Sequence, residues 1–179
     1  VLTDTTLAAA TLTPTVNGYS SVAINANSVT TLTGTNAEIL AAYAADTAGT
    51  VVFNDTSVNL TVDANTSITV AQANALNGKT SGVITATIST TDIDVLDDLT
   101  GSGNAYTITV ADSQVNASAL NTVNAASTEN VTATAVTQIT GTAAQLASTY
   151  GGGITGLGNE TIVLTDTTLA AATLTPTVN

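Results

Sequence analysis

The segment VLTDTTLAAATLTPTVN, Val1 to Asn17, returns letter for letter as Val163 to Asn179. Chance does not produce an identity of this length. Packing does not require it either, because stacked repeats keep their apolar positions and turns while their exposed positions drift. The identity indicates recent duplication or selection for uniformity. It predicts that residues 1–162 form one full compound period of a tandem repeat, that residues 163–179 start the next identical period, and that the chain is part of a longer protein.

Weaker repeats lie inside this period. VTTLTGTNAEILAAY (residues 29–43) and VTQITGTAAQLASTY (residues 136–150) share Thr-Gly-Thr and several apolar positions at equal spacing. ITVADSQVNASAL from Ile108 and IVLTDTTLAAATL from Ile162 share a second frame, and their starts are separated by one third of the full period. Since each such third contains two strand-like starts, the period is predicted to hold about six unequal coils.

Each coil is predicted to contain a strand, a short helix and a corner. Alternation of apolar residues with Thr, as in YTITVAD and ETIVLTD, is typical of half-buried strands. Stretches such as NAEILAAYAA, AAQLAST, IDVLDDL and ASALNTV favour short helices, often behind a capping Thr, Asp or Asn. The predicted coils begin near Val22, Val51, Val83, Tyr106, Val131 and Thr161, with a strand-like insertion between Val58 and Val70.

Units this short cannot bury an apolar face alone, so they are expected to stack with their strands pairing in parallel. The predicted fold class is therefore a parallel β-solenoid with a strand and a short helix per coil, similar to a leucine-rich-repeat α/β solenoid. A β-sandwich is the alternative, because short Thr-rich strands also suit that architecture.

Composition excludes several classes of function. The chain has thirteen acidic residues against one base, Lys79, and a net charge of −12. A surface of this sign repels nucleic acid and anionic lipid headgroups. The longest apolar runs are far shorter than the roughly 20 residues that a membrane-spanning helix needs, so no membrane insertion is expected. Neither His nor Cys is present, and we therefore expect no enzymatic activity and no catalytic residues.

The densest acidic cluster is the candidate for a bound ion. Asp92, Asp94, Asp97 and Asp98 in TDIDVLDDL offer closely spaced carboxylate ligands of the kind that Ca²⁺ prefers. The alternative is that Asp92 caps a short helix whose first turn favours acids. The aspartates that follow strands are expected to make hydrogen bonds at corners (Asp4, Asp55, Asp112 and Asp166). Apart from Ca²⁺, no cofactor is expected.

Two polar patterns suggest other ligands. The TAT strings at residues 85–87 and 132–134 resemble the hydroxyl arrays of ice-binding repeats, although ordinary β-propensity also explains Thr on strands. Glycans are a candidate partner at the Asn-x-Ser/Thr sequons, which begin at Asn54, Asn59, Asn65, Asn116, Asn130 and Asn159.

The strings TLTGTNAEILAAYA, DSQVNASALNTV and QITGTAAQLASTYGGGITGLGNETIVLTDTTLAA resemble the repeats of giant bacterial cell-surface proteins, known especially from cyanobacteria. The resemblance covers most of the chain and weakens between Val58 and Lys79. It implies an extracellular or cell-surface protein of great length, without catalytic residues, whose partners are copies of itself joined end to end or side by side.

Two hypotheses follow for the function. The first is a structural repeat of an extracellular filament, sheath or surface layer. The second is a surface adhesin or a module that binds a glycan or ice.

Overall fold

A computed structural model describes residues 1–53 and 56–168, with the side chains of all of these except residues 14 and 15. Asn54 and Asp55, for which a sequon and a corner hydrogen bond are predicted, lie outside the described residues, and so does the part of the duplicated segment after Thr168. The chain divides into two compact units, Val1–Thr87 (unit 1) and the part from Ile88 onward (unit 2).

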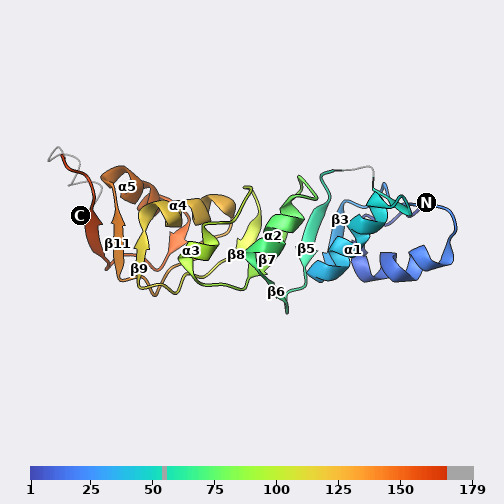
Figure 1. The fold of residues 1–179 in the computed structure, drawn as a ribbon, viewed down its shortest axis with the longest axis horizontal. Coiled ribbons are helices and arrows are strands. Elements are labelled where there is room, and N and C mark those ends of the chain that lie inside the picture. Colours follow the sequence, from blue (N-terminus) through green and yellow to red (C-terminus); the bar gives the residue numbers. More distant parts are fainter. Residues whose placement is uncertain (54–55, 169–179) are drawn as a thin grey trace. The chain divides into compact units, whose positions relative to one another are not determined.

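Unit 1 contains two parallel sheets and its helices (Figure 1). The larger sheet has the order β1-β3-β5-β7-β6, formed by β1 (Thr6–Ala8), β3 (Thr31–Gly34), β5 (Asn59–Val62), β7 (Ile84–Ile88) and β6 (Ser67–Ile68). The smaller sheet pairs β2 (Ile24–Asn25) with β4 (Val51–Val52). The helical segments are η1 (Thr11–Val16), η2 (Asn17–Tyr19), α1 (Asn36–Thr47) and α2 (Val70–Asn77).

Unit 2 also has two parallel sheets. The order of the larger one is β13-β11-β9, from β9 (Gln114–Asn116), β11 (Gln138–Gly141) and β13 (Thr161–Leu164). The smaller one pairs β10 (Val131–Thr132) with β12 (Ile154–Thr155), and β8 (Ala105–Thr107) precedes them in the chain. The helices are α3 (Ile93–Leu96), α4 (Ala117–Ala126) and α5 (Ala143–Gly151), of which α4 contacts both α5 and the strands β9 and β11 (Figure 1).

The core consists of apolar columns that run across paired strands. In unit 1, Leu32, Leu60 and Ile84 are directly in register on β3, β5 and β7, and none of the three side chains is exposed. In unit 2, Val115 and Ile139 are in register on β9 and β11 and are likewise buried. Alternation places these residues inward because successive side chains of a strand point to opposite faces. The alternating pattern therefore predicts the inward-facing residues correctly.

Local capping begins the helices α1 and α5 where the sequence predicts them. At α1 the Thr35 hydroxyl accepts a hydrogen bond from the Glu38 N–H, while the Glu38 carboxylate accepts from the Thr35 N–H at 2.8 Å. The same reciprocal arrangement joins Thr142 and Gln145 at α5. Each pair satisfies two N–H groups that have no partner inside the helix. These helices and the parallel pairing of the strands are confirmed.

The prediction of one parallel β-solenoid of about six stacked coils, similar to a leucine-rich-repeat solenoid, is wrong. The chain is a small α/β protein with several short parallel sheets and intervening helices. Two-residue strands such as β2 and β4 pair only with each other. Apolar alternation specifies which residues face inward, but it does not specify that a hydrogen-bonded ladder continues from one strand to the next.

Two narrower expectations are also corrected. The β-sandwich alternative is wrong because the named strand pairs are all parallel, for example β3 with β5 and β9 with β11, whereas sandwiches are built from antiparallel sheets. The predicted insertion between Val58 and Val70 is not an interruption of the sheet. It supplies β5, which lies between β3 and β7 and pairs with both.

Candidate functional site

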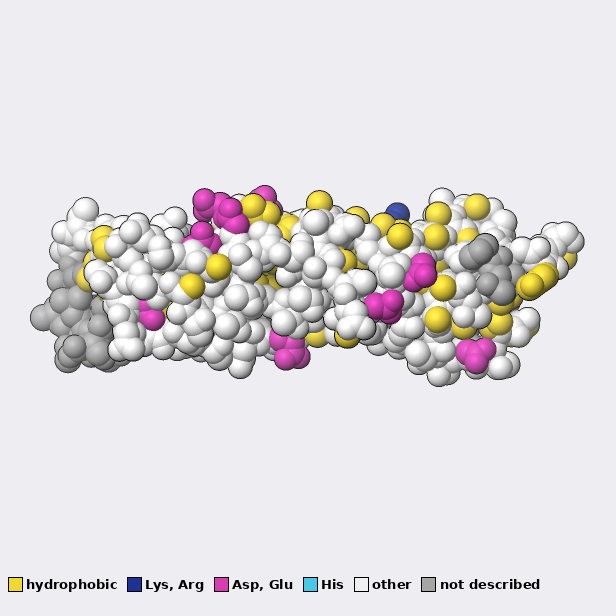
Figure 2. Space-filling view, turned by 90° about the horizontal axis from the view of Figure 1, so that it is seen from below, with side chains coloured by type: hydrophobic (Ala, Val, Ile, Leu, Met, Phe, Trp, Pro, Cys, Tyr) yellow, Lys and Arg dark blue, Asp and Glu magenta, His cyan; other side chains and the backbone are white. Residues whose placement is uncertain are grey.

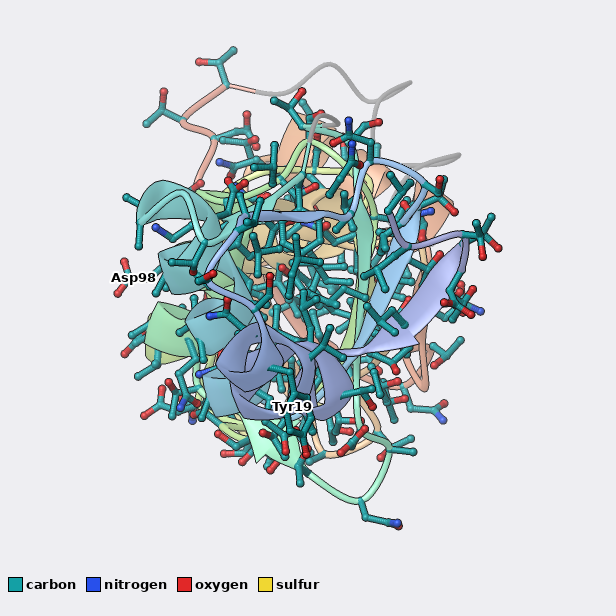
Figure 3. The ribbon with its side chains drawn as sticks, turned by 90° about the vertical axis from the view of Figure 1, so that its right-hand side faces the viewer. Tyr19 and Asp98 are labelled. Carbon is teal, nitrogen blue, oxygen red and sulfur yellow. The ribbon has the colours of Figure 1, made fainter. Side chains whose placement is uncertain are left out.

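The predicted acidic cluster surrounds the very short helix α3. Asp92 precedes the helix, and its carboxylate accepts a hydrogen bond from the Asp94 N–H at 3.0 Å. Asp97 ends the helix. Ile93 and Leu96 face the core, so the aspartates are turned toward the outside. Figure 3 shows the Asp98 side chain directed away from the body of the protein.

A further aspartate from the next segment of the chain completes the cap of α3. The Asp112 Oδ2 atom accepts a hydrogen bond from the Ile93 N–H at 2.8 Å. Asp166 repeats this role at α5, where its Oδ2 atom accepts from the Ala143 N–H at 2.8 Å. A carboxylate in this position satisfies an N–H group at the positive end of the helix dipole. Asp112 and Asp166 were predicted to make hydrogen bonds at corners, and each instead caps a helix of an earlier segment.

This arrangement is a poor fit to a calcium site. Within residues 1–53 and 56–168, no group of three or more acidic side chains is arranged to hold a metal ion. The Asp92 carboxylate is already engaged with a backbone N–H group, as is that of the neighbouring Asp112. The calcium site at Asp92, Asp94, Asp97 and Asp98 therefore stays a prediction, and we base no function on it.

Beside α3 lies a groove that the sequence did not predict, with a volume of about 260 Å³. We call it the amide groove. Gln114 on β9 and Gln138 on β11 are paired in register, and Asn116 is paired with Thr140 two positions further along. Asp94 and Asp112 supply carboxylates to the same groove. Its lining residues are Ile93, Asp94, Asp112, Gln114, Val115, Asn116, Gln138 and Thr140.

The chemistry of the amide groove is that of recognition. Its amide, hydroxyl and carboxylate groups donate and accept hydrogen bonds. Side chains of this kind match the hydroxyl groups of a sugar. The two glutamines are far apart in the sequence and come together only through the strand register. The sequence signal that would have found them is the pair of apolar residues that follow them, Val115 and Ile139, which occupy equivalent inward positions.

Three threonine hydroxyls donate hydrogen bonds to backbone carbonyls of the preceding segment. The Thr30 hydroxyl donates a hydrogen bond to the Thr5 carbonyl at 3.1 Å, and the Thr137 hydroxyl donates to the Ser113 carbonyl at 3.0 Å. Thr128 makes the same bond to the Asn104 carbonyl at 3.1 Å. These hydroxyl groups serve the internal structure of their own unit.

Another row of threonines faces outward. Thr33, Thr61 and Thr85 are in register across β3, β5 and β7, and their side chains are exposed or half-buried. This row is the arrangement in unit 1 that comes nearest to the predicted hydroxyl array.

One face of the protein shows few charged side chains. Figure 2 shows a face that is mostly uncharged, on which the acidic side chains form small separate groups. In the part of the chain that the structure describes, no helix is long and apolar enough to cross a membrane.

A comparison with protein-family models, curated proteins and solved structures finds no match to this chain.

Proposed function

We propose that this chain is a structural repeat of an extracellular bacterial filament, sheath or surface layer, in which copies join end to end. The observation that carries the proposal is that one sequence device builds the same local structure in both units. Thr33-Gly34-Thr35 and Thr140-Gly141-Thr142 each end a parallel strand and begin a helix with a reciprocal cap. Recurrence of such a device is what a repeat needs when neighbouring copies must fit one another.

The glycine of this device has a steric role. A Cβ atom on Gly34 would lie 2.9 Å from the Glu38 Oε2 atom, and one on Gly141 would lie 3.2 Å from the Gln145 Oε1 atom. Glycine thus leaves room for the capping side chain to fold back onto the threonine N–H. Thr-Gly-Thr provides this room at both places in the sequence, whereas at α2 the same cap of Thr69 and Gln72 follows Ile68.

The polar groups of the protein support a structural role. Threonine hydroxyls and aspartate carboxylates are used to join strands and to cap helices, and the chain contains neither His nor Cys for catalysis. We propose no enzymatic step. The extracellular location is part of the proposal, and its support is the resemblance of the Thr- and Ala-rich strings to bacterial surface repeats.

Imaging and sedimentation of the purified chain test this function. We expect filaments or sheets by electron microscopy and species that grow with protein concentration by analytical ultracentrifugation. Repeating both measurements with a calcium chelator separates the calcium hypothesis from the structural one, because assembly through apolar and backbone contacts persists without the ion. Single globular particles at every concentration would contradict the proposal.

A second candidate function is binding of a glycan by a surface adhesin, and the amide groove is the observation that favours it. Gln114 and Gln138 are exposed or half-buried, so their amide groups are accessible to a ligand. Screening the chain against immobilised glycans, with the Gln114→Ala/Gln138→Ala double variant as the control, tests this function. Equal binding by both proteins would argue against the groove.

For ice, the row of Thr33, Thr61 and Thr85 is the surface to test by inhibition of ice recrystallisation.

A further inference from the structure

In unit 1, one edge of the segment formed by residues 1–17 is hydrogen-bonded to the rest of the unit. The Leu2 N–H donates a hydrogen bond to the Asn25 carbonyl at 2.9 Å. The Thr5 carbonyl accepts a hydrogen bond from the Thr30 N–H at 2.8 Å. Immediately after these contacts, β1 pairs in parallel with β3. The backbone of the segment is therefore tied to the strands that follow it in the chain.

Side chains of the same segment also contact unit 1. Ala9 and Leu12 are completely buried in unit 1. At the end of the segment, the Asn17 Nδ2 atom donates a hydrogen bond to the Thr50 Oγ1 atom at 3.1 Å. Unit 1 thus has a site fitted to the sequence VLTDTTLAAATLTPTVN, and we call it the segment site.

The second copy of the sequence is held along its opposite edge. In unit 2, Val163 is paired with Thr140 on β11, and the Thr165 N–H donates a hydrogen bond to the Gly141 carbonyl at 3.1 Å. The Asp166 carboxylate caps α5. These contacts tie the segment to the strand that precedes it in the chain.

The two copies of the sequence make their contacts through different residues. Thr165 corresponds to Thr3 and Asp166 to Asp4, and in the first copy both of those residues are exposed. Leu2, which bonds to the strands that follow, corresponds to Leu164, the neighbour of Thr165. Because neighbouring residues of a strand direct their N–H groups to opposite sides, a single copy can make both sets of contacts at once.

We propose that residues 163–179 of one chain occupy the segment site of a second chain, in place of that chain's own residues 1–17, and so join the two chains head to tail. This inference deepens the proposed structural function by naming the joint and its partner, a second copy of this chain. The segment site cannot distinguish the two segments, because their sequences are identical. A contact of this kind is head to tail, because the segment of one chain meets a different surface of the next, and a head-to-tail contact that does not close into a ring extends into a filament.

Two apolar side chains that follow the segment are exposed in unit 1. Tyr19, which follows the segment in η2, is 87% exposed, and Val22 is 73% exposed. Figure 3 shows Tyr19 at the surface of the helical turns that the first segment forms.

The exchange has a distinctive dependence on concentration and time. The number of strand pairings is the same before and after the exchange, since one segment replaces another. The released segment regains conformational freedom, whereas association of two chains loses translational freedom. Joined chains are therefore expected to increase with concentration and to form slowly, at the rate at which residues 1–17 leave the segment site.

The duplication supplies matched variants for the test. Leu12 of the first copy corresponds to Leu174 of the second. Leu174→Asp places a charge on the incoming segment and is expected to abolish the oligomers seen with the unaltered chain. Leu12→Asp weakens the segment that competes for the site and is expected to increase them. The double variant is expected to remain monomeric. Sedimentation measures all four proteins, and circular dichroism shows that each variant is folded.

Cross-linking tests the register in the absence of destabilising changes. The chain contains no cysteine, so a Thr168→Cys variant and a Thr31→Cys variant can be mixed and treated with a short bis-maleimide. Thr168 corresponds to Thr6, which is paired with Thr31. We expect a cross-linked dimer of the two different variants. A Thr85→Cys variant in place of Thr31→Cys is the control and is expected to give none, because Thr85 lies on β7, away from the segment site.

The outcomes separate this inference from the proposed function. Oligomers of the Leu174→Asp variant equal to those of the unaltered chain, with no specific cross-link at Thr31, would overturn the exchange and leave a structural function through another contact. Monomers for the unaltered chain and for Leu12→Asp at every concentration would overturn both.

Discussion

The Asp166 Oδ2 atom lies 2.8 Å from the Ala143 N atom and accepts its hydrogen bond, so a residue that follows β13 caps the helix that follows β11. Asp112 stands in the same relation to Ile93 at α3. In unit 2, each of these carboxylates ties one strand–helix segment to the segment before it. This contact adds a side-chain link to the backbone pairing of the parallel strands.

Replacing this capping aspartate is expected to destabilise unit 2. Asp166→Ala removes the acceptor for the Ala143 N–H, and loss of a helix cap costs about 1 kcal/mol in the free energy of unfolding. The duplication provides an internal control, because Asp4 has the same sequence neighbours but is exposed. Asp4→Ala should change the free energy of unfolding by less than about 0.5 kcal/mol. Urea unfolding of both variants measures the difference, and equal losses would show that the Asp166 cap contributes nothing.

A methyl group on the glycine before α5 is expected to be more damaging. A Cβ atom on Gly141 would lie 2.7 Å from the Ala117 Cβ atom, a distance that requires the backbone to shift. Overpacking of this kind costs about 1–3 kcal/mol. At Gly151 a Cβ atom would meet nothing within 4 Å, so Gly151→Ala is the matched control. The expected result is a lower urea midpoint for Gly141→Ala alone, and a midpoint that is unchanged in Gly141→Ala would refute the steric role of the Thr-Gly-Thr device.

Removing one buried hydroxyl is expected to stabilise the protein. Tyr106 is completely buried, and among the described residues its hydroxyl group has no hydrogen-bonding partner. A buried polar group without a partner costs about 1–3 kcal/mol, so Tyr106→Phe should raise the free energy of unfolding by about 1 kcal/mol. Tyr19→Phe is the control, since the Tyr19 ring is 87% exposed and its hydroxyl is accessible to water. A lower melting temperature for Tyr106→Phe would indicate that the hydroxyl is paired.

Local sequence signals predicted the elements of this protein better than their assembly. Thr35 and Glu38 are three residues apart, and a reciprocal cap depends on that spacing, which also joins Thr69 and Gln72 at α2. Alternation similarly identified Leu32 and Ile84 as inward residues. Whether consecutive strands share one sheet depends on the path of the chain between them, which apolar periodicity does not encode.

In the candidate sites, too, local features were easier to predict from the sequence than contacts between distant segments. A hydrogen bond of Asp112 was predicted at a corner, but its partner, the Ile93 N–H at the start of α3, belongs to an earlier segment and was not predicted. The amide groove was not predictable from composition, since Gln114 and Gln138 meet only through the register of β9 and β11. The dense aspartates of α3 gave the strongest sequence signal for a metal. The structure gives one of them, Asp92, a role as a helix cap that needs no ion, and the calcium site stays a prediction.

The pair formed by Tyr150 and Glu160 predicts how stability changes with pH. The Tyr150 hydroxyl donates a hydrogen bond to the Glu160 Oε2 atom at 2.8 Å, and the Gly158 N–H donates to both carboxylate oxygens. Burial by itself raises the pKa of Glu160, but these hydrogen bonds outweigh it and lower the pKa below 4.5. Burial, together with the bond to Glu160 and its negative charge, raises the pKa of Tyr150 to about 12.

The two shifts act on opposite sides of neutral pH. Because the folded state lowers the pKa of Glu160, its contribution to stability is complete above pH 4.5 and is lost as the pH falls through the folded value. Because the folded state raises the pKa of Tyr150 from 10.0 to about 12, its contribution is complete below pH 10.0 and is lost as the pH rises toward 12. Stability is therefore expected to decline at both extremes.

Substitution of the two partners separates the acidic limb from the alkaline limb. Glu160→Gln should flatten the decline in the free energy of unfolding below pH 4.5, and Tyr150→Phe should flatten the decline above pH 10.0. Glu38 also has a lowered pKa because of its hydrogen bonds to the Thr35 backbone and hydroxyl, so Glu38→Gln measures the part of the acidic limb that belongs to α1. Urea unfolding across the pH range provides the comparison. If Glu160→Gln and the unaltered chain lose stability equally in acid, the carboxylate of Glu160 is not held by Gly158 and Tyr150 in the folded protein.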